Sequence, residues 1–151
     1  MCCWWVKKNG RQAEQALGRS RGGFSTKIHI LVDALGNPLR FLLTGGQRHD
    51  LTQAEKLIDA FQFHYVIADK GYDADAFCQT ITALKAEAVI PTRKSRVEPR
   101  AYDAHLYKER HLVECFINKI KWFRRIFTRY DKLARRYTAF LHFAATLIWL
   151  R

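Results

Sequence analysis

The chain has 151 residues, 48% of them hydrophobic and 13% aromatic, so it is long and apolar enough for one domain with a sizeable core and is not a disordered chain. Its four cysteines show no Cys-x-x-Cys spacing, which argues against a zinc site or a disulfide framework and fits a reducing cytoplasm. The formal net charge is +12, and residues 91–136 hold 14 Lys or Arg against 5 Asp or Glu. This concentration of charge favours a polyanion as partner, with nucleic acid ahead of a membrane; a solvated basic face is the alternative.

The first part of the chain predicts a basic lead-in followed by a β-hairpin. Residues 1–23 are expected to form a flexible basic lead-in, because residues 7–23 are rich in Lys, Arg, Gln and Gly. Apolar positions over 26–32 and 39–43 predict two antiparallel strands, and Gly36-Asn37-Pro38 between them is a turn signal.

The middle of the chain predicts alternating helices and strands. In order, these are a helix capped by Asp50 or Thr52 and reaching about Phe61, a strand over 65–68 that ends at Asp69, a helix capped by Asp73 and reaching about Leu84, and a strand over 88–90.

The last part predicts two helices, over about 103–127 and 131–150. The apolar run that begins at Tyr137 is about 14 residues long, short of the roughly 20 needed to span a bilayer, and therefore predicts a core helix. Together the elements predict an α/β fold with a mixed sheet covered by helices, in which strand-end carboxylates point into a ligand-binding crevice.

The predicted helix over 103–127 has two distinct faces. At about 100° per residue, four polar positions fall within an arc of about 60°: Tyr107, Arg110, Glu114 and Lys121. On the opposite side, apolar positions fall within about 80°: Leu112, Phe116, Ile120, Phe123 and Phe127. One face would pack on the core and leave a carboxylate, a phenol and two cations free for chemistry. Trp122, Phe123, Phe127 and Trp149 are expected in the core or at a partner contact rather than stacked on bases.

Asp69 and Glu114 are the candidate metal ligands. Carboxylates at a strand end and on a nearby helix suit Mg²⁺, which prefers oxygen ligands. Two such ions about 4 Å apart can activate an attacking oxygen and stabilise a leaving oxygen in phosphodiester displacement. Taken singly, Asp69 is better explained as a turn former and Glu114 as a solvated helix residue; their shared spacing is what favours a metal site.

The spacing Tyr107-x2-Arg110-x3-Glu114-x6-Lys121 matches the Y-x2-R-x3-E-x6-K signature, and the chain therefore resembles the DDE-class transposases of bacterial insertion sequences. The segment Ala68-Asp69-Lys70-Gly71-Tyr72-Asp73 resembles the block that carries their second catalytic aspartate. Similar stretches occur at 18–29, 33–38 and 145–151, so the resemblance covers residue 16 to the C-terminus.

The resemblance implies a ribonuclease-H-like fold, with a mixed sheet flanked by helices. It implies that Asp69 and Glu114 are the second and third members of an acidic triad that binds two Mg²⁺ or Mn²⁺ ions. Arg110 and Lys121 would contact transposon-end DNA, with Tyr107 beside them, since cations neutralise phosphates and an aromatic ring supports an opened strand. Pairing of Arg110 and Lys121 with Glu114 or Glu109 is the alternative.

The chain departs from the family upstream, where the first, central strand and its catalytic aspartate should precede residue 18. Residues 24–151 are therefore predicted to form a partial catalytic domain that ends in helices, with an incomplete metal site. Asp33 and Asp50 are weak substitutes for the missing carboxylate, and the apolar run 2–6 is a weak substitute for the strand.

The expected function is that of a fragment of an insertion-sequence transposase, which cleaves and joins DNA at transposon ends and target and is inactive alone. The expected partners are DNA and either the upstream transposase portion or further copies of the chain, in the bacterial cytoplasm at the nucleoid and without a membrane. The alternative is a non-catalytic DNA-binding remnant or partner subunit of a transposase.

Overall fold

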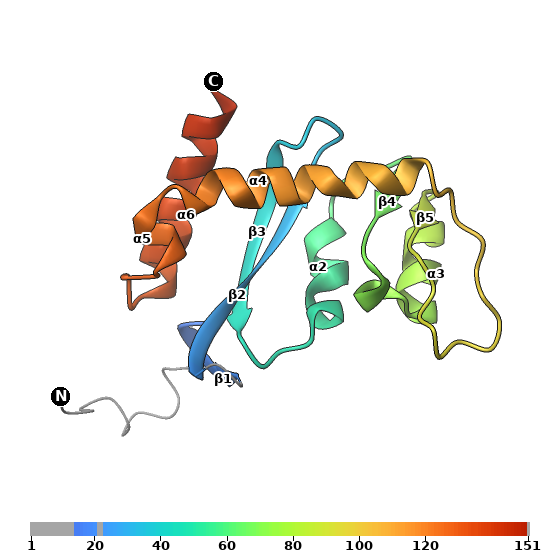
Figure 1. Ribbon diagram of the computed structural model, residues 1–151, viewed down its shortest axis with the longest axis horizontal. Coiled ribbons are helices and arrows are strands. Elements are labelled where there is room, and N and C mark those ends of the chain that lie inside the picture. The colour runs from blue at the N-terminus through green and yellow to red at the C-terminus, as the bar shows by residue number, and fades with distance from the viewer. Residues whose placement is uncertain (1–13, 21–22, 151) are drawn as a thin grey trace.

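The computed structural model describes residues 14–20 and 23–150 and shows helices packed around two small sheets (Figure 1). The first sheet has the order β1-β2-β3 and is antiparallel; it consists of Gly18–Ser20, Gly23–Val32 and Pro38–Gly45. The second sheet pairs β4 (Tyr65–Ile67) with β5 (Glu87–Val89) in parallel. The predicted α/β class is confirmed, but the described strands form two sheets rather than the single mixed sheet that was predicted.

The hairpin of β2 and β3 follows from its turn residues. Oδ1 of Asp33 accepts hydrogen bonds from the backbone N–H groups of Leu35 (2.9 Å) and Asn37 (2.8 Å). Gly36 has a φ of +82°, a left-handed conformation that glycine adopts with little strain. Asp33 therefore has a local structural role in closing the turn.

Strand β1 lies within the lead-in that was predicted for residues 1–23. Its residues pair with the start of β2, with Gly18 opposite Ser25. Residues 1–13 and 21–22 lie outside the described residues, so the division into a flexible lead-in and a partial domain over 24–151 stays a prediction.

The helical elements follow the hairpin and alternate with β4 and β5. They are the 3₁₀ helix η1 (Asp50–Gln53), α2 (Ala54–Ile58), the 3₁₀ helix η2 (Lys70–Tyr72), α3 (Asp75–Ala83), the 3₁₀ helix η3 (Leu106–Arg110), α4 (His111–Lys121), α5 (Arg124–Phe127) and α6 (Ala134–Trp149).

Two of the predicted helix caps are wrong. At the start of η1, Nδ1 of His49 accepts the N–H of Leu51, whereas the Asp50 carboxylate forms an ion pair with Lys27 at 3.0 Å. Helix α3 begins after Ala74 without a side-chain cap, because the carboxylate of Asp73 is engaged by the loop that follows β5. In both cases a longer-range partner competes with the local capping bond.

The helix predicted over 103–127 is interrupted. Phe123 has an extended backbone (φ −82°, ψ 92°), so that α4 ends at Lys121 and the short α5 starts at Arg124. Beyond this break Ile126 is buried and Phe127 is 68% exposed, so the prediction that Phe127 extends the apolar stripe is wrong. The carbonyl of Ile126 accepts the hydroxyl of Tyr137 at 2.9 Å, which ties α5 to α6.

Two clusters of buried side chains hold the molecule together. The first, here called the hairpin core, joins the hairpin to α4, α5 and α6 and contains Phe41, Phe116, Ile120, Ile126, Tyr137, Leu141, Ala144 and Ala145. The second, here called the α3 core, surrounds α2, α3, β4 and β5 and contains Ala54, Ile58, Val66, Phe77, Cys78, Ile81, Ala86 and Ile90.

The continuous helical segment of η3 and α4 crosses both parts of the molecule (Figure 1). Its N-terminal end contacts β4, and α4 contacts β2 and α6. The face that was predicted to carry chemistry therefore begins beside the strand that leads to Asp69. Within the described residues, no helix combines the length and the apolar character needed to cross a bilayer.

Candidate active site and DNA contacts

Asp69 stands two residues beyond the end of β4, at the entrance of η2, and its side chain is exposed. Oδ1 of Asp69 accepts the N–H of Gly71 at 2.5 Å, which fixes the carboxylate against its own turn. A Cβ atom at Gly71 would lie 2.7 Å from this oxygen, so a side chain at that position would displace the carboxylate of Asp69. The second carboxylate oxygen of Asp69 is left available to a ligand from solvent.

Glu114 lies in the first turn of α4, and its side chain is 55% exposed. Oε1 of Glu114 accepts a hydrogen bond from Nη2 of Arg110 at 2.6 Å. An exposed ion pair between residues four apart on a helix contributes only about 0.3–0.5 kcal/mol, so a metal ion or a phosphate can replace either partner at little cost.

Arg110 connects the two carboxylates electrostatically. The hydrogen bond that it donates to Glu114 raises the pKa of the guanidinium, and the negative charge of Asp69 contributes to the same shift. Asp69 and Glu114 are 45 positions apart in the sequence, and the fold nevertheless brings both within electrostatic reach of one side chain.

Tyr107 and Lys121 occupy the two ends of the predicted face. The ring of Tyr107 is half-buried, meets that of Tyr102 edge-on with centroids 5.6 Å apart, and lies 5.9 Å from Cζ of Arg110. Lys121 is exposed, and its Nζ donates to Oδ1 of Asn118 at 3.3 Å. The structure thus places Tyr107, Arg110 and Glu114 together, and Lys121 about 10 Å further along the helix axis from Glu114.

The donor set for a divalent ion is chemically suitable and incomplete. Asp69 and Glu114 offer exposed carboxylate oxygens, the ligands that Mg²⁺ prefers. Across residues 14–20 and 23–150, however, no group of three or more His, Cys, Asp or Glu side chains is placed to hold a metal ion. Asp69 and Glu114 therefore stay two candidate ligands among the described residues.

The two weak substitutes for that carboxylate differ in their surroundings. The pKa of Asp33 is lowered: desolvation acts to raise it, but hydrogen bonds from Asn37 and Leu35 lower it by more, in keeping with the place of Asp33 in the hairpin turn. Asp50 is paired with Lys27 but also acts on Tyr72: burial raises the pKa of Tyr72 to about 12, and the charges of Asp50 and Asp69 add to this shift. Asp50 is the substitute whose field overlaps that of Asp69.

Large aromatic side chains are exposed between cations on α4 and α5. Trp122 is 86% exposed, Phe127 68% and Tyr130 64%. Neither Trp122 nor Phe127 lies in the core. Lys119, Lys121 and Arg124 are exposed in the same stretch, so groups that can bind phosphate and groups that can stack on bases are interspersed in the sequence there.

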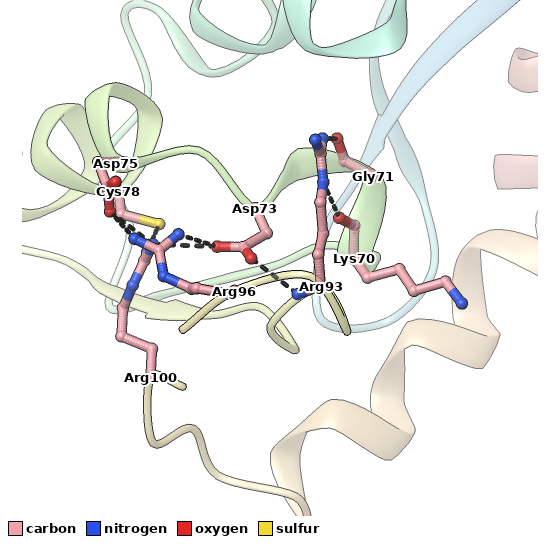
Figure 2. A network of polar contacts seen from close by, with 8 residues as sticks. All are labelled: Lys70, Gly71, Asp73, Asp75, Cys78, Arg93, Arg96 and Arg100. Atoms are coloured by element: carbon pink, nitrogen blue, oxygen red, sulfur yellow. Dashed lines mark hydrogen bonds and ion pairs between the residues drawn. The ribbon is translucent and has the colours of Figure 1, made fainter. Parts of the chain in front are cut away.

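The sequence did not indicate a cluster of arginines behind the Asp69 turn. Figure 2 shows Asp73 between Arg93 on one side and Arg96 and Arg100 on the other. These contacts join positions that are 20 to 27 residues apart. Neither helical nor strand periodicity reports pairings of this kind, and the only sequence signal is the high density of arginine after Pro91.

An exposed strand-end carboxylate beside a basic helix that carries a second carboxylate is typical of α/β proteins that process nucleic acids. Comparison with known proteins makes the class specific: residues 6–149 match the family described as "Transposase DDE domain". The chain belongs to this family of DDE-class insertion-sequence transposases, as the resemblance of its motifs predicted.

Two relatives illustrate the membership. A Brucella ovis protein named as a transposase for the insertion sequence element IS6501 is 43% identical over 129 residues, which cover 84% of this chain and 99% of the relative. A Burkholderia cepacia protein named as a transposase for the element IS402 is 32% identical over 142 residues, which cover 86% of this chain and 64% of that protein. No solved structure matches the chain.

Proposed function

We propose that this chain is the downstream part of the catalytic domain of an insertion-sequence transposase, which cleaves and joins DNA strands at transposon ends. The observation that supports the proposal is the hydrogen bond from Arg110 to Glu114, together with the charge of Asp69 that also acts on Arg110, because both carboxylates match the motifs of the family. The exposed basic and aromatic side chains of α4 and α5 supply the adjoining surface for DNA.

In this proposal each side chain has one role. Asp69 and Glu114 would hold Mg²⁺ or Mn²⁺, which would supply Lewis-acid activation of the phosphate and of the attacking oxygen. Arg110 and Lys121 neutralise and position phosphates, and the ring of Tyr107 supports a nucleotide beside them. Water and then a 3′-hydroxyl would displace the leaving oxygen in line, so no covalent enzyme intermediate is needed.

The first carboxylate of the triad and the central strand of a ribonuclease-H-like sheet are proposed to come from an upstream portion. In the part of the chain that the structure describes, no strand joins β2 to β4. A strand between them would merge the two sheets into one mixed sheet and would satisfy open backbone edges. The Burkholderia cepacia relative extends beyond the matched part, whereas the Brucella ovis relative is matched over 99% of its length. We expect the transposase to act in the cytoplasm, on nucleoid DNA.

The test is Mn²⁺-dependent nicking and joining of transposon-end DNA by this chain and by the same chain extended with its upstream coding segment. Only the extended form is expected to react. In that form Asp69→Asn and Glu114→Gln should abolish cleavage, whereas Glu109→Gln, a matched change on the exposed surface of the same helical segment, should not. Full metal-dependent cleavage by the Asp69→Asn, Glu114→Gln double variant would refute the catalytic assignment.

A second candidate is a DNA-binding remnant or a partner subunit of a full-length transposase. It is favoured because, among the described residues, no group of three or more His, Cys, Asp or Glu side chains is placed to hold a metal ion. Salt-sensitive binding of transposon-end DNA together with inactivity of the extended form would select this candidate. Activity of the short chain would instead mean that Asp33 or Asp50 completes the metal site.

A further inference from the structure

Arg93, in the loop after β5, donates hydrogen bonds to the backbone of the turn that carries Asp69. Nε of Arg93 donates to the carbonyl of Lys70 at 3.1 Å, and Nη2 donates to the carbonyl of Gly71 at 2.7 Å. The two acceptors are consecutive and belong to η2, so one guanidinium spans the turn (Figure 2). The same turn presents the Gly71 N–H to which the Asp69 carboxylate is bound.

Asp73 holds Arg93 in place. The side chain of Asp73 is 2% exposed, and its Oδ2 accepts the backbone N–H of Arg93 at 2.8 Å. Its Oδ1 accepts hydrogen bonds from Arg96 and Arg100, each at 3.0 Å. A buried carboxylate needs such partners, because its charge is costly to desolvate.

The other two arginines secure the loop to α3. Arg96 and Arg100 both reach the carboxylate of Asp75, and Arg100 also contacts Sγ of Cys78. Arg96 and Arg100 reach the turn through the side chain of Asp73, the residue that follows η2, whereas Arg93 donates directly to the carbonyls of η2. The loop then continues to η3 and α4, which carry Tyr107, Arg110 and Glu114.

We propose that Arg93 and Asp73 are positioning residues for Asp69, in that they fix the η2 turn so that its carboxylate keeps a constant position relative to Glu114. The inference rests on the proposed function for its catalytic consequence. With both Nε and one Nη engaged by carbonyls, Arg93 acts through the backbone of the turn and is not a phosphate contact. A change of about 1 Å in the position of a ligand can reduce the rate of a reaction about 100-fold.

The first test measures the turn itself, by amide hydrogen exchange at Gly71, Tyr72 and Asp73 in the chain as it stands. Arg93→Ala should speed exchange at these amides about tenfold or more, because the carbonyl side of the turn loses both donors. Arg93→Lys, which keeps the charge and fewer donors, should give an intermediate increase and serves as the second variant if Arg93→Ala does not fold. Asp73→Asn should change the same amides in the same direction.

Arg96→Ala is the matched control, since it removes an arginine from the same loop and the same carboxylate without removing a contact to η2. Its exchange at Gly71 and Tyr72 should stay close to that of the unmodified chain. Equal exchange in Arg93→Ala and Arg96→Ala, or no change in either, would overturn the proposal.

The second test measures catalysis in the chain extended with its upstream segment. Arg93→Ala should slow Mn²⁺-dependent cleavage about 10–100-fold and raise the Mn²⁺ concentration needed for half-maximal rate, while binding of transposon-end DNA without metal stays unchanged. A loss of DNA binding equal to the loss of rate would make Arg93 a DNA contact and would refute the positioning role. If the extended chain itself does not cleave DNA, the proposed function fails, and the exchange experiment still decides whether Arg93 and Asp73 fix the turn.

Discussion

Replacing Phe116 by alanine should destabilise the protein far more than replacing Phe127, although the sequence places both rings on the same apolar stripe. Phe116 is 1% exposed and packs in the hairpin core, where its ring centroid lies 5.9 Å from that of Phe41. Phe127 is 68% exposed because the backbone bends at Phe123. The two substitutions remove the same atoms, so the difference between them isolates burial.

The expected magnitudes are well separated. Removal of a fully buried phenylalanine ring costs about 3–5 kcal/mol, because the apolar transfer free energy is lost and a cavity remains. An exposed substitution away from special features stays within about 0.5 kcal/mol. Since domains are stable by only about 5–15 kcal/mol, Phe116→Ala removes a large part of the total. For a chain of this length, the midpoint of thermal unfolding should fall by about 6–20 °C.

The assay is urea unfolding followed by far-ultraviolet circular dichroism, with the free energy of unfolding compared among the unmodified chain, Phe116→Ala and Phe127→Ala. A large loss for Phe127→Ala that equals the loss for Phe116→Ala would refute the break at Phe123 and would restore the single helix over 103–127. A small loss for both would mean that α4 does not pack on the hairpin through Phe116.

Three further predictions concern charge. Burial lowers the pKa of His29, although the charge of Asp50 acts in the opposite direction, so the folded state resists protonation. The free energy of unfolding should therefore fall as the pH drops below about 6.5. His29→Gln should reduce this fall, measured as urea midpoints between pH 7.5 and 5.5. Burial raises the pKa of Tyr72 to about 12, and the charges of Asp50 and Asp69 add to the shift, so the free energy of unfolding should fall as the pH rises from about 10 to about 12. In an ultraviolet absorbance titration, Asp69→Asn should lower the pKa of Tyr72. Tyr72→Phe should remove the absorbance change near pH 12. Binding of transposon-end DNA should weaken steeply with salt, and Lys121→Ala should reduce the slope of log K against log salt by about 1, whereas Lys56→Ala on α2 should leave it unchanged.

Local signals predicted the elements well where neighbouring residues decide the backbone. The Gly36-Asn37-Pro38 turn gave the hairpin, and the strands found at Gly23–Val32 and Pro38–Gly45 extend the predicted ones by a few residues. The strand before Asp69 and the helix that follows it were also predicted, with α3 ending one residue before Leu84. In these segments propensity, turn chemistry and burial agree.

The failures have a common physical cause, which is competition from distant partners. Helical periodicity runs without interruption to Phe127, but the chain bends at Phe123 because Ile126 is buried against α6 and its carbonyl accepts the Tyr137 hydroxyl. Asp73 has the residue type of a helix cap and lies one residue before the N-cap position of α3, but arginines from the following loop bind its carboxylate. No pattern within a window of neighbouring residues contains these partners.

The sequence predicted the residues of the candidate site but not the contacts that hold them in place. The spacing of Tyr107, Arg110 and Glu114 on one face survives the change from 3₁₀ to α geometry at His111, because residues three and four apart remain neighbours in both. Sequence reasoning paired Arg110 with either DNA or Glu114, and the structure shows the pair with Glu114. The hydrogen bonds from Arg93 to the Asp69 turn could be found only from the structure.

The two carboxylates are attached to different cores, and this makes the geometry of the site depend on how the cores are joined. Glu114 is carried by α4, which the side chains of Phe116 and Ile120 anchor in the hairpin core. Asp69 follows β4, whose Val66 belongs to the α3 core. The contact of η3 with β4 and the loop fastened by Asp73 are two of the links between them. A strand inserted between β2 and β4 would add a hydrogen-bonded link to each sheet and so hold Asp69 and Glu114 at a fixed separation. In the proposed function, an upstream portion would contribute to the geometry of the site as well as its third carboxylate.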